Sequence, residues 1–505
     1  MDSRLLRQPT VGDLIIRALR RYPERLAFTG ADGEASYSDV ALRVARLIAL
    51  FDTLGLEKGA TVAQLARNSI SQWSVIAACY IAGLRSVTMQ AYAADPEGQA
   101  YFLRKSDADV VICDAEFAGC VQPLTALVPR VRNWFCHQEA IPGAVGLAEA
   151  MEKVAPTELV DRAEPEDIVR VGFTSGTTGP AKGVLLSSRA LAACAVINTS
   201  EDPWPRRPVV LCAEGVAGGF GNFIVPTLML GGTVVLGQRA EPEVVLALMG
   251  QYRPNMLLCL PMLFNAILDH SEAGAVDWSS LELLIFSGAS IAPTRLAEAQ
   301  GLFGPVVSQV YGQTDCPKGL AILTRADHSR PDKLGSVGTP FSTVEVAILG
   351  RDGGRCAVGE IGELCARGPI VMSGYAQEPE LSAARLSNGW LHTGDLASQD
   401  VDGYLTLYDR VEYRLVDGER TVPARQVEDG LRGRAGILDV ALVQHGGRVT
   451  AFVVGADGIS DEAVRDHARR AGWDRIDAVR IIDELPLLMI GRVNKGLLRQ
   501  WAEAA

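Results

Sequence analysis

A run rich in glycine and hydroxyl side chains constrains the fold of this chain more than any other feature. The apolar residues 168–173 predict a buried strand, and residues 174–184 then read Thr-Ser-Gly-Thr-Thr-Gly-Pro-Ala-Lys-Gly-Val. Glycines let backbone N–H groups approach an anion, hydroxyls donate hydrogen bonds, and the lysine adds a positive charge. The spacing is not that of a Walker A loop, in which Ser or Thr follows the lysine. The run predicts a phosphate-binding turn made by Thr174, Ser175, Gly176, Thr177, Thr178, Gly179 and Lys182.

Length and composition predict a folded protein of more than one domain. The chain has 505 residues, of which 48% are hydrophobic and 21% charged, and this is too long for one ordinary core. A net charge of −12 argues against a nucleic-acid surface, which needs clustered Lys and Arg. Ten cysteines without a Cys-x-x-Cys pair, and six scattered histidines, favour free thiols over a disulfide frame or a zinc site.

Residues 208–238 imitate a membrane span, because Glu214 is their only charged residue. Their prolines and glycine pairs favour a buried strand–helix–strand passage instead. The first seven residues lack the apolar stretch of a signal peptide. We therefore expect a cytoplasmic protein with no membrane span.

The rhythm of the apolar runs predicts an α/β fold in two domains. Residues 1–409 begin with alternating strand and helix patterns, which suggest two α/β subdomains. After about residue 334, short strands and Gly-rich turns such as residues 351–354 predict a β-rich subdomain that completes this large domain. Residues 410–505 carry their own strand and helix patterns, enough for a small α+β domain.

Four further motifs follow the loop in a fixed order. Residues 311–315 read Tyr-Gly-Gln-Thr-Asp, residues 393–395 read Thr-Gly-Asp, residues 409–410 read Asp-Arg, and residues 486–495 begin with Pro and end with Lys. With these motifs the chain resembles, over essentially its whole length, the adenylate-forming superfamily of acyl-CoA synthetases, luciferases and nonribosomal adenylation domains. The resemblance is to that family's Tyr-Gly-x-Thr-Glu motif, its Thr-Gly-Asp motif, its hinge dipeptide and its C-terminal catalytic loop.

The resemblance implies an acid–thiol ligase that works in two half-reactions with ATP, Mg²⁺ and CoA. A carboxylic acid attacks the α-phosphate of ATP to give acyl-AMP, the mobile small domain rotates, and CoA then takes the acyl group and releases AMP. Thr314 would contact the α-phosphate, Asp315 would help to hold Mg²⁺, and Gly418 would keep the thiol's path open. The implied nucleotide site and hinge comprise Gly288, Ala289, Ser290, Gln309, Val310, Tyr311, Gly312, Gln313, Asp395, Tyr408, Arg410, Asp409 and Glu412.

Arg492 is the most informative departure from the family pattern. The lysine that it replaces bridges the carboxylate and the α-phosphate during adenylation. Arginine keeps the charge but presents a planar fork of donors instead of a rotatable point charge, and Lys495 stands too far along to substitute. We expect weak or absent adenylation with intact thioester formation from acyl-AMP, which a separate adenylating enzyme would then supply.

The segment that would line the acyl pocket is made of small residues. Residues 213–221 stand where the family carries aromatic and histidine side chains, so the space would suit a bulky apolar acid. Alternatively, the glycines only allow close backbone packing. Glu214 could recognise a hydroxyl or an amine, or could face solvent. The candidate substrate residues are Glu214, Gly215, Ala217, Gly218 and Phe220.

Three other functions fit the same motifs. The chain could be a complete two-step acyl-CoA synthetase in which Arg492 suffices, or it could transfer the acyl group to a carrier protein. It could also be a non-enzymatic member that only binds nucleotide or acyl-AMP. Retention of Thr314, Asp395, Arg410 and Gly418 argues against the last of these.

Overall fold

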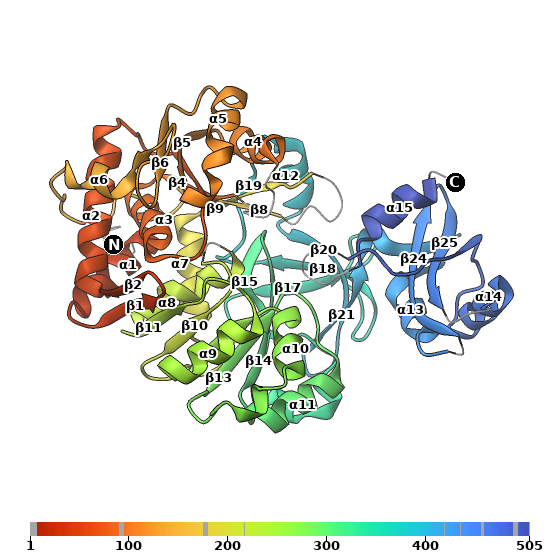
Figure 1. Cartoon of the computed structure of the whole chain (residues 1–505). Coiled ribbons are helices and arrows are strands. Elements are labelled where there is room, and N and C mark those ends of the chain that lie inside the picture. Colours follow the sequence, from red (N-terminus) through yellow and green to blue (C-terminus); the bar gives the residue numbers. More distant parts are fainter. Residues whose placement is uncertain are drawn as a thin grey trace, which may run out of the picture.

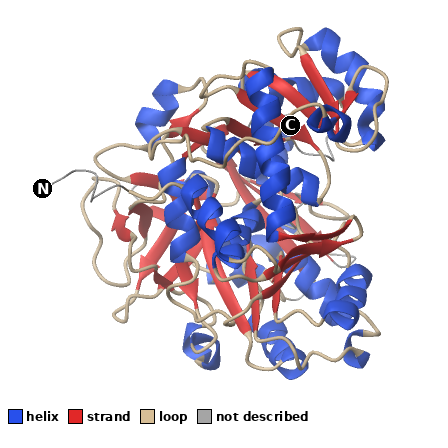
Figure 2. Cartoon of the chain, turned by 90° about the vertical axis from the view of Figure 1, so that its left-hand side faces the viewer, coloured by secondary structure: helices blue, strands red, loops and turns tan. Residues whose placement is uncertain are grey.

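Hydrogen bonding gathers the strands of the larger, N-terminal part into three sheets, and a smaller C-terminal part follows at one side (Figure 1). The computed structural model describes residues 8–89, 95–174, 180–216, 218–418, 420–434, 436–455, 459–487 and 493–503. Figure 2 shows the helices packed over the strands of the larger part. The chain therefore has the expected mixed α/β fold, with a large N-terminal and a small C-terminal domain.

The first large sheet has nine strands in the order β16-β15-β14-β13-β12-β10-β11-β1-β2. Its central strands are parallel, and β12 reads Met-Leu-Leu-Cys with every residue buried, as expected for a strand covered on both faces. The strands are β1 (Leu26–Gly30), β2 (Gly33–Ser36), β10 (Val209–Cys212), β11 (Thr233–Leu236), β12 (Met256–Cys259), β13 (Leu283–Ser287), β14 (Val307–Gln313), β15 (Cys316–Leu323) and β16 (Thr339–Pro340).

The second large sheet has eight strands in the order β19-β9-β8-β4-β3-β5-β6-β7. Strand β8, which leads into the phosphate loop, pairs in parallel with β4 and antiparallel with β9. The strands are β3 (Thr61–Leu65), β4 (Arg85–Thr88), β5 (Ala108–Cys113), β6 (Asn133–Cys136), β7 (Val145–Gly146), β8 (Ile168–Phe173), β9 (Gly183–Ser187) and β19 (Gly374–Tyr375).

Helices between the two large sheets share one core with both of them. Phe28 of the first sheet packs on Trp73 of α3, with ring centroids 4.9 Å apart. Ser69 caps the start of α3, and Gly83 ends it with a φ of 73°, which glycine adopts without strain. The helices of this layer are α1 (Val11–Arg21), α2 (Tyr37–Thr53), α3 (Ile70–Ala82), α7 (Ser188–Ile197) and α8 (Ile224–Met229), with η3 (Gly219–Phe223).

The outer faces of the two sheets form separate cores. On the first sheet, Phe264, Trp278, Phe286 and Phe303 pack together with ring centroids 4.6–6.2 Å apart. The remaining helices of these subdomains are α4 (Pro96–Lys105), α5 (Ala118–Leu127), α6 (Leu147–Glu152), α9 (Pro242–Tyr252), α10 (Pro261–Asp269) and α11 (Pro293–Phe303), with η2 (Ala115–Phe117), η4 (Ala273–Ala275), η5 (Asp327–Ser329) and η6 (Pro331–Lys333).

A four-stranded antiparallel sheet, β17-β18-β20-β21, is the β-rich subdomain. The C-terminal part beyond it has its own core around Trp473. The β-rich elements are β17 (Glu345–Leu349), β18 (Gly362–Arg367), α12 (Pro379–Arg385), β20 (Leu391–Gln399) and β21 (Leu405–Arg410). The C-terminal elements are η7 (Val411–Tyr413), β22 (Arg414–Asp417), β23 (Arg420–Pro423), α13 (Ala424–Leu431), β24 (Ile437–His445), β25 (Arg448–Gly455), α14 (Asp461–Arg470), β26 (Ala478–Ile481) and α15 (Lys495–Glu503).

The apolar segment 208–238 forms β10, η3, α8 and β11, as expected for a buried passage. Within the described part of the chain, every helix is too short or too polar to cross a bilayer. The predicted domain boundary between residues 409 and 410 lies between the last two residues of β21. Its position stays a prediction.

Candidate active site

Three of the predicted nucleotide residues meet around the carboxylate of a fourth, Asp395. Its Oδ2 accepts hydrogen bonds from the Tyr311 hydroxyl and from Gln313 Nε2, each at 2.5 Å. Its Oδ1 accepts one from Arg410 Nη1 at 2.9 Å. The strands fix this meeting, because Asp395 and Arg410 are directly paired in the β20–β21 register. The cluster thus combines an acceptor and a fixed fork of donors in one place.

Burial and charge define the protonation states of this cluster. Burial, and next to it the Asp395 carboxylate, raises the pKa of Tyr311 well above its usual value. Burial works against the charge on Arg410, but Asp395, together with Glu412 and Tyr311, outweighs it and leaves the pKa of Arg410 raised. At neutral pH Tyr311 is therefore a neutral donor and Arg410 a cation.

The predicted magnesium ligand, Asp315, is buried and already has two donors. Its Oδ2 accepts from the Tyr375 hydroxyl at 2.5 Å and from Arg385 Nε at 3.3 Å. Arg385 also donates from Nη2 to the Thr393 carbonyl at 2.8 Å, which ties Asp315 to the Thr-Gly-Asp turn. Sequence reasoning missed Tyr375 and Arg385, because only the β19–β9 pairing and helix α12 bring them here.

The foot of the phosphate loop is closed by two hydrogen bonds. Thr174 N donates to the Lys182 carbonyl at 3.1 Å, and Lys182 N donates to Thr174 Oγ1 at 3.0 Å. The Lys182 ammonium lies 5.9 Å from the centre of the Tyr375 ring. The other predicted loop residues, Ser175, Gly176, Thr177, Thr178 and Gly179, lie outside the described residues.

Thr314 lies against the strand that leads into this loop. A Cβ built on Gly172 of β8 would be 3.1 Å from Thr314 Cγ2, a tight contact, so Thr314 packs closely on this strand. Thr314 thus approaches the foot of the phosphate loop, as its predicted contact with the α-phosphate requires.

An open cleft of ≈ 480 Å³ lies between the large domain and the C-terminal part. Five cationic side chains line it against two carboxylates, so its field favours an anion of several charges. The cations are Lys182, Arg385, Arg410, Arg414 and Arg499, and the carboxylates are Glu363 and Glu412.

The remaining predicted nucleotide residues lie along β13, β14 and β21. Gly288 has a φ of 103°, in the region that favours glycine, and Ser290 Oγ is 3.4 Å from Arg425 Nη2 of the C-terminal part. Gln309 and Val310 are buried in β14, and Gly312 lies at its irregularity between Tyr311 and Gln313. The Tyr408 hydroxyl is 3.1 Å from Ser398 Oγ, and Ala289 is partly buried in the loop after β13.

The predicted hinge residue Asp409 is joined to the C-terminal part by two hydrogen bonds. Its Oδ2 accepts from Lys495 Nζ at 3.1 Å and from Arg425 N at 3.0 Å, and Lys495 also binds Glu428 Oε1 at 2.8 Å. The Lys495 side chain is only 8% exposed. The second hinge residue, Glu412, is 3.7 Å from Arg410 Nε.

Arg492 lies outside the described residues, but the two ends of its loop are paired. Leu487 and Val493 form a β-bridge, and Asn494 N donates to the Pro486 carbonyl at 2.7 Å. Gly418 lies at the tip of the β22–β23 hairpin with a φ of 60°, two residues beyond Val416, which lines the cleft.

The small residues of the predicted acyl segment allow close backbone packing at one position and leave open space at another. A Cβ on Gly221 would lie 1.7 Å from the Val216 carbonyl oxygen, so this glycine allows close packing, whereas the neighbourhood of Gly215 is open. Glu214 Oε1 accepts from Leu260 N at 3.1 Å. Phe220 is buried, and the centre of its ring is 6.1 Å from that of Phe223. Gly218 is exposed, and Ala217 lies outside the described residues.

One group of side chains could hold a metal ion. The ligating atoms of Glu363, Cys365 and His392 lie within 4.8 Å of one another at the β18–β20 pair. Glu363 Oε2 is 2.9 Å from His392 Nδ1, and Glu363 Oε1 accepts from Gly394 N at 3.0 Å. Burial raises the pKa of the Cys365 thiol to about 12, so an ion would have to displace its proton. The sequence, with its scattered histidines, did not predict this group.

Fold and site together define an adenylate-forming type of enzyme, and comparison with known proteins agrees. The sequence profile of the family described as AMP-binding enzyme matches residues 15–376, so the chain belongs to that family. It is 30% identical to the medium/long-chain-fatty-acid–CoA ligase FadD8 of Mycobacterium tuberculosis, over 99% of this chain and 91% of that protein. It is also 30% identical to a feruloyl-CoA synthase of Amycolatopsis, over 98% of this chain and 99% of that protein.

Solved structures show the same architecture. The amide bond synthetase McbA of Marinactinospora thermotolerans superposes with a TM-score of 0.84 at 29% identity, covering 97% of this chain and 99% of that one. Because the relatives are matched over almost their full length, this chain is an enzyme of the AMP-binding ligase family, related to acid–CoA ligases.

Proposed function

We propose that this protein transfers an acyl group from acyl-AMP to the thiol of CoA, and that its own adenylation step is weak or absent. The single observation that carries the proposal is the state of the two basic residues at the C-terminal loop. Arg492 replaces the lysine implied by the family resemblance, and Lys495, the next basic residue, is buried between Asp409 and Glu428. In this arrangement neither provides a free, rotatable ammonium group.

The residues of the site divide the work of binding. Asp395 accepts the ribose hydroxyls while Arg410 supplies donors, and the foot of the phosphate loop with Lys182 faces the phosphates. Thr314 would donate to the α-phosphate. These groups neutralise charge rather than move protons, and such electrostatic stabilisation is the main catalytic effect in phosphoryl chemistry.

The thiol step depends on the other side of the cleft. The hairpin that bears Gly418 and Val416 belongs to the C-terminal part, as do Arg414 and Arg499. A thiol that passes Gly418 would meet the acyl carbonyl in the cleft, and AMP would leave with its phosphate still among the cations. The arginine at position 492, in place of the family's lysine, would leave this step intact. The resemblance implies that the loop bearing this residue swings away before the thiol enters.

Magnesium fits the site in a limited way. Asp315 offers a carboxylate oxygen, the ligand type that Mg²⁺ prefers, but Arg385 lies 3.3 Å from Oδ2 and already compensates its charge. Mg²⁺ would therefore be held mainly by nucleotide phosphates, with Asp315 as one protein ligand. When bound, it would neutralise phosphate charge during adenylation.

A split assay tests the proposal. Pyrophosphate release from ATP, Mg²⁺ and a panel of acids is measured beside acyl-CoA formation from the same acids presented as presynthesised acyl-AMP with CoA. We expect thioester formation without pyrophosphate release. Turnover in both arms would instead identify a complete synthetase, and binding of acyl-AMP without either product would identify a non-enzymatic member.

The acceptor is tested in the same experiment. The likeness to an amide bond synthetase favours an amine as a second candidate acceptor. Free CoA, a carrier protein with its pantetheine arm, and a primary amine are each offered to the enzyme with one acyl-AMP. The proposal predicts that CoA gives the highest kcat/KM; a preference for the carrier or the amine would overturn this assignment.

A further inference from the structure

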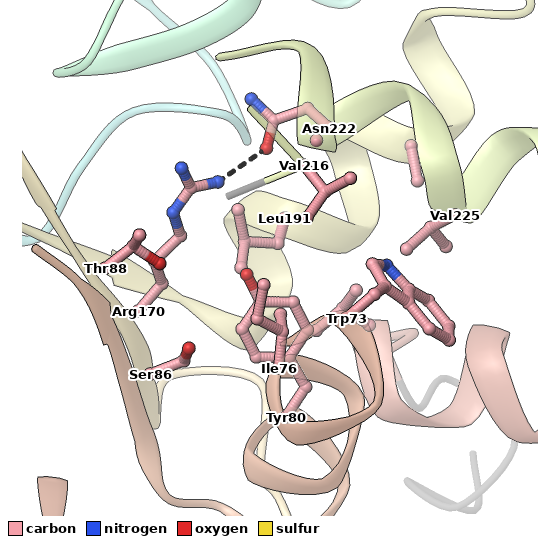
Figure 3. A pocket seen from close by; sticks show the side chains of 13 residues that line it. Trp73, Ile76, Tyr80, Ser86, Thr88, Arg170, Leu191, Val216, Asn222 and Val225 are labelled. Atoms are coloured by element: carbon pink, nitrogen blue, oxygen red, sulfur yellow. Dashed lines mark hydrogen bonds between the residues drawn. The ribbon is translucent and has the colours of Figure 1, made fainter. Parts of the chain in front are cut away.

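A small cavity, apolar on one side and polar on the other, lies beside strand β8, which leads into the phosphate loop (Figure 3). Its volume is ≈ 20 Å³, which is room for about one water molecule. Trp73 and Val225 form part of its apolar wall. On the polar side, Figure 3 shows Arg170 of β8 between the hydroxyls of β4 and the amide of Asn222.

The register of strand β8 relates this cavity to the reacting phosphate. Gly172 and Arg170 are alternate residues of β8, so their side-chain positions share one face of the strand about 7 Å apart. Gly172 faces the methyl group of Thr314, the residue predicted to contact the α-phosphate. Arg170 therefore lies on the same face of β8 as Gly172, about 7 Å further from the expected position of the phosphate.

The predicted acyl segment forms the opposite wall of the cavity. Val216, Gly221 and Asn222 all line it. Arg170 donates from Nη1 to Asn222 Oδ1 at 2.9 Å and from Nη2 to the Gly218 carbonyl at 3.3 Å. An acyl group that is attached to the phosphate and runs along this segment would thus point at the guanidinium.

The chemistry of the cavity floor suits an oxygen rather than a hydrocarbon. Arg170 is only partly buried, and its planar fork of N–H donors matches a carboxylate or a carbonyl. Ser86, which is paired with Arg170 in the β4–β8 register, and Thr88 bring hydroxyls to the same space. A buried oxygen that these groups bind would keep its hydrogen bonds, whereas a purely apolar end could not replace the Asn222 amide oxygen as an acceptor for Arg170.

We propose that this cavity is the far end of the acyl pocket, and that Arg170 binds a hydrogen-bond-accepting oxygen at the end of the acid remote from its reacting carboxyl group. The inference rests on the proposed function and refines the expected substrate. The acid carries an accepting oxygen about 7 Å beyond the activated carbonyl, and the water-sized cavity beside Trp73 and Val225 takes only the small group that bears this oxygen. That oxygen takes the place of the Asn222 amide at the guanidinium.

Matched pairs of acids test the proposal. Each pair shares one carbon skeleton with and without a distal carboxylate or carbonyl, and both members are supplied as acyl-AMP with CoA. We expect the wild type to prefer the oxygenated member by about tenfold or more in kcat/KM, because a site built for an oxygen rejects the analogue that lacks it. Arg170→Met should bring the ratio close to one by lowering activity on the oxygenated member only.

Two further variants distinguish binding of the substrate oxygen by Arg170 from structural support of the acyl segment. Thr88→Val removes one hydroxyl at nearly constant volume and keeps the bonds of Arg170, so it should lower the preference by a smaller factor. Arg130→Met removes an exposed ion pair with Asp109 far from the cavity and should leave the ratio unchanged. An equal loss on both members in Arg170→Met would show that Arg170 only supports the acyl segment, and would overturn the proposal.

Failure of the inference is distinct from failure of the proposed function. A wild type that forms thioesters without any preference contradicts the role of Arg170 alone. If no acyl-AMP yields a thioester, calorimetry of the same acyl-AMP pairs still decides, because it requires no turnover. Tighter binding of the oxygenated member, lost in Arg170→Met, would support the role of Arg170, and equal binding would overturn it.

Discussion

At the scale of single residues, Asp395 is the centre of the proposed nucleotide site. The sequence predicted Asp395, Tyr311, Gln313 and Arg410 from their motifs, and the strand pairing brings all four into direct contact. It could not predict that Asp315 contacts Tyr375 and Arg385, because these residues lie 60 and 70 positions further along and belong to no motif of their own. Contacts between distant segments depend on the sheet order, which motif spacing does not encode.

Replacement of Asp395 tests the centre of this site. In Asp395→Asn the charge that faces Arg410 is lost and one accepting oxygen becomes a donor, so AMP affinity should fall by about tenfold or more, equivalent to about 1.4 kcal/mol. Isothermal titration calorimetry with AMP measures this change. Asp332→Asn, at an exposed ion pair with Arg330, is the matched control and should bind AMP like the wild type. Equal affinities in all three proteins would contradict the assignment.

His137 gives a second prediction at this scale. Burial, with a contribution from the nearby Arg43, lowers the pKa of His137 to about 4, and its Nδ1 is 2.8 Å from Ser71 Oγ. Since the folded pKa is below the usual 6.5, protonation favours the unfolded chain, and stability that is present above pH 6.5 is lost as the pH falls toward 4. Between pH 7.5 and pH 5 the cost is about 2 kcal/mol.

Urea denaturation at the two pH values measures this cost. The wild type should lose about 2 kcal/mol more than His137→Gln on acidification, because the variant has no imidazole to protonate. The same pH dependence in both proteins would show that His137 does not carry the effect.

At the scale of elements, the local sequence pattern predicted individual strands and helices, but it did not predict which strands pair. The expected strand at residues 168–173 is β8, and the expected buried strand–helix–strand passage at 208–238 forms β10, η3, α8 and β11. These elements carry strong periodicity or uniform apolar runs. The two-residue strand β19, which brings Tyr375 to the site by pairing with β9, is too short for any periodicity to reveal it.

Gly221 in η3 tests whether the acyl segment depends on close packing. In Gly221→Ala the added methyl group would collide with the Val216 carbonyl oxygen, so unfolding free energy should fall by about 2–3 kcal/mol. Gly250→Ala in helix α9, where nothing lies within 4 Å, is the control and should be neutral or stabilising by about 0.5–1 kcal/mol. Thermal denaturation compares the two variants, and equal stability would mean that η3 relaxes without cost.

At the scale of the whole molecule, the rhythm of the apolar runs predicted a mixed α/β fold with a large and a small domain, and the structure has this fold. A large domain of two α/β subdomains and a β-rich sheet is followed by a small domain with its own core. The contacts of Lys495 could not be predicted, because Asp409 and Glu428 lie 86 and 67 residues earlier and the meeting depends on how the C-terminal part folds back. Those contacts connect the predicted hinge residue Asp409 to the C-terminal part.

Replacement of Lys495 tests whether these contacts stabilise the C-terminal part. Lys495→Met leaves Asp409 and Glu428 buried without their shared cation, so the C-terminal part should lose about 3 kcal/mol of stability. Hydrogen exchange followed by mass spectrometry should show faster exchange in β24 and β25 than in the wild type. Lys153→Met removes only an exposed pair with Glu149 and should leave these strands unchanged. Unaltered exchange in both variants would show that the ion contacts do not stabilise this part.

The measurement that tests the central claim most directly is ATP–pyrophosphate exchange by the wild type and by Arg492→Lys, with the acids whose acyl-AMP the enzyme converts to thioesters. We predict exchange near background for the wild type and at least tenfold faster exchange for Arg492→Lys, because a rotatable ammonium can bridge carboxylate and α-phosphate where a planar guanidinium cannot. Vigorous exchange by the wild type, with no gain in Arg492→Lys, would contradict the account and identify a complete acyl-CoA synthetase.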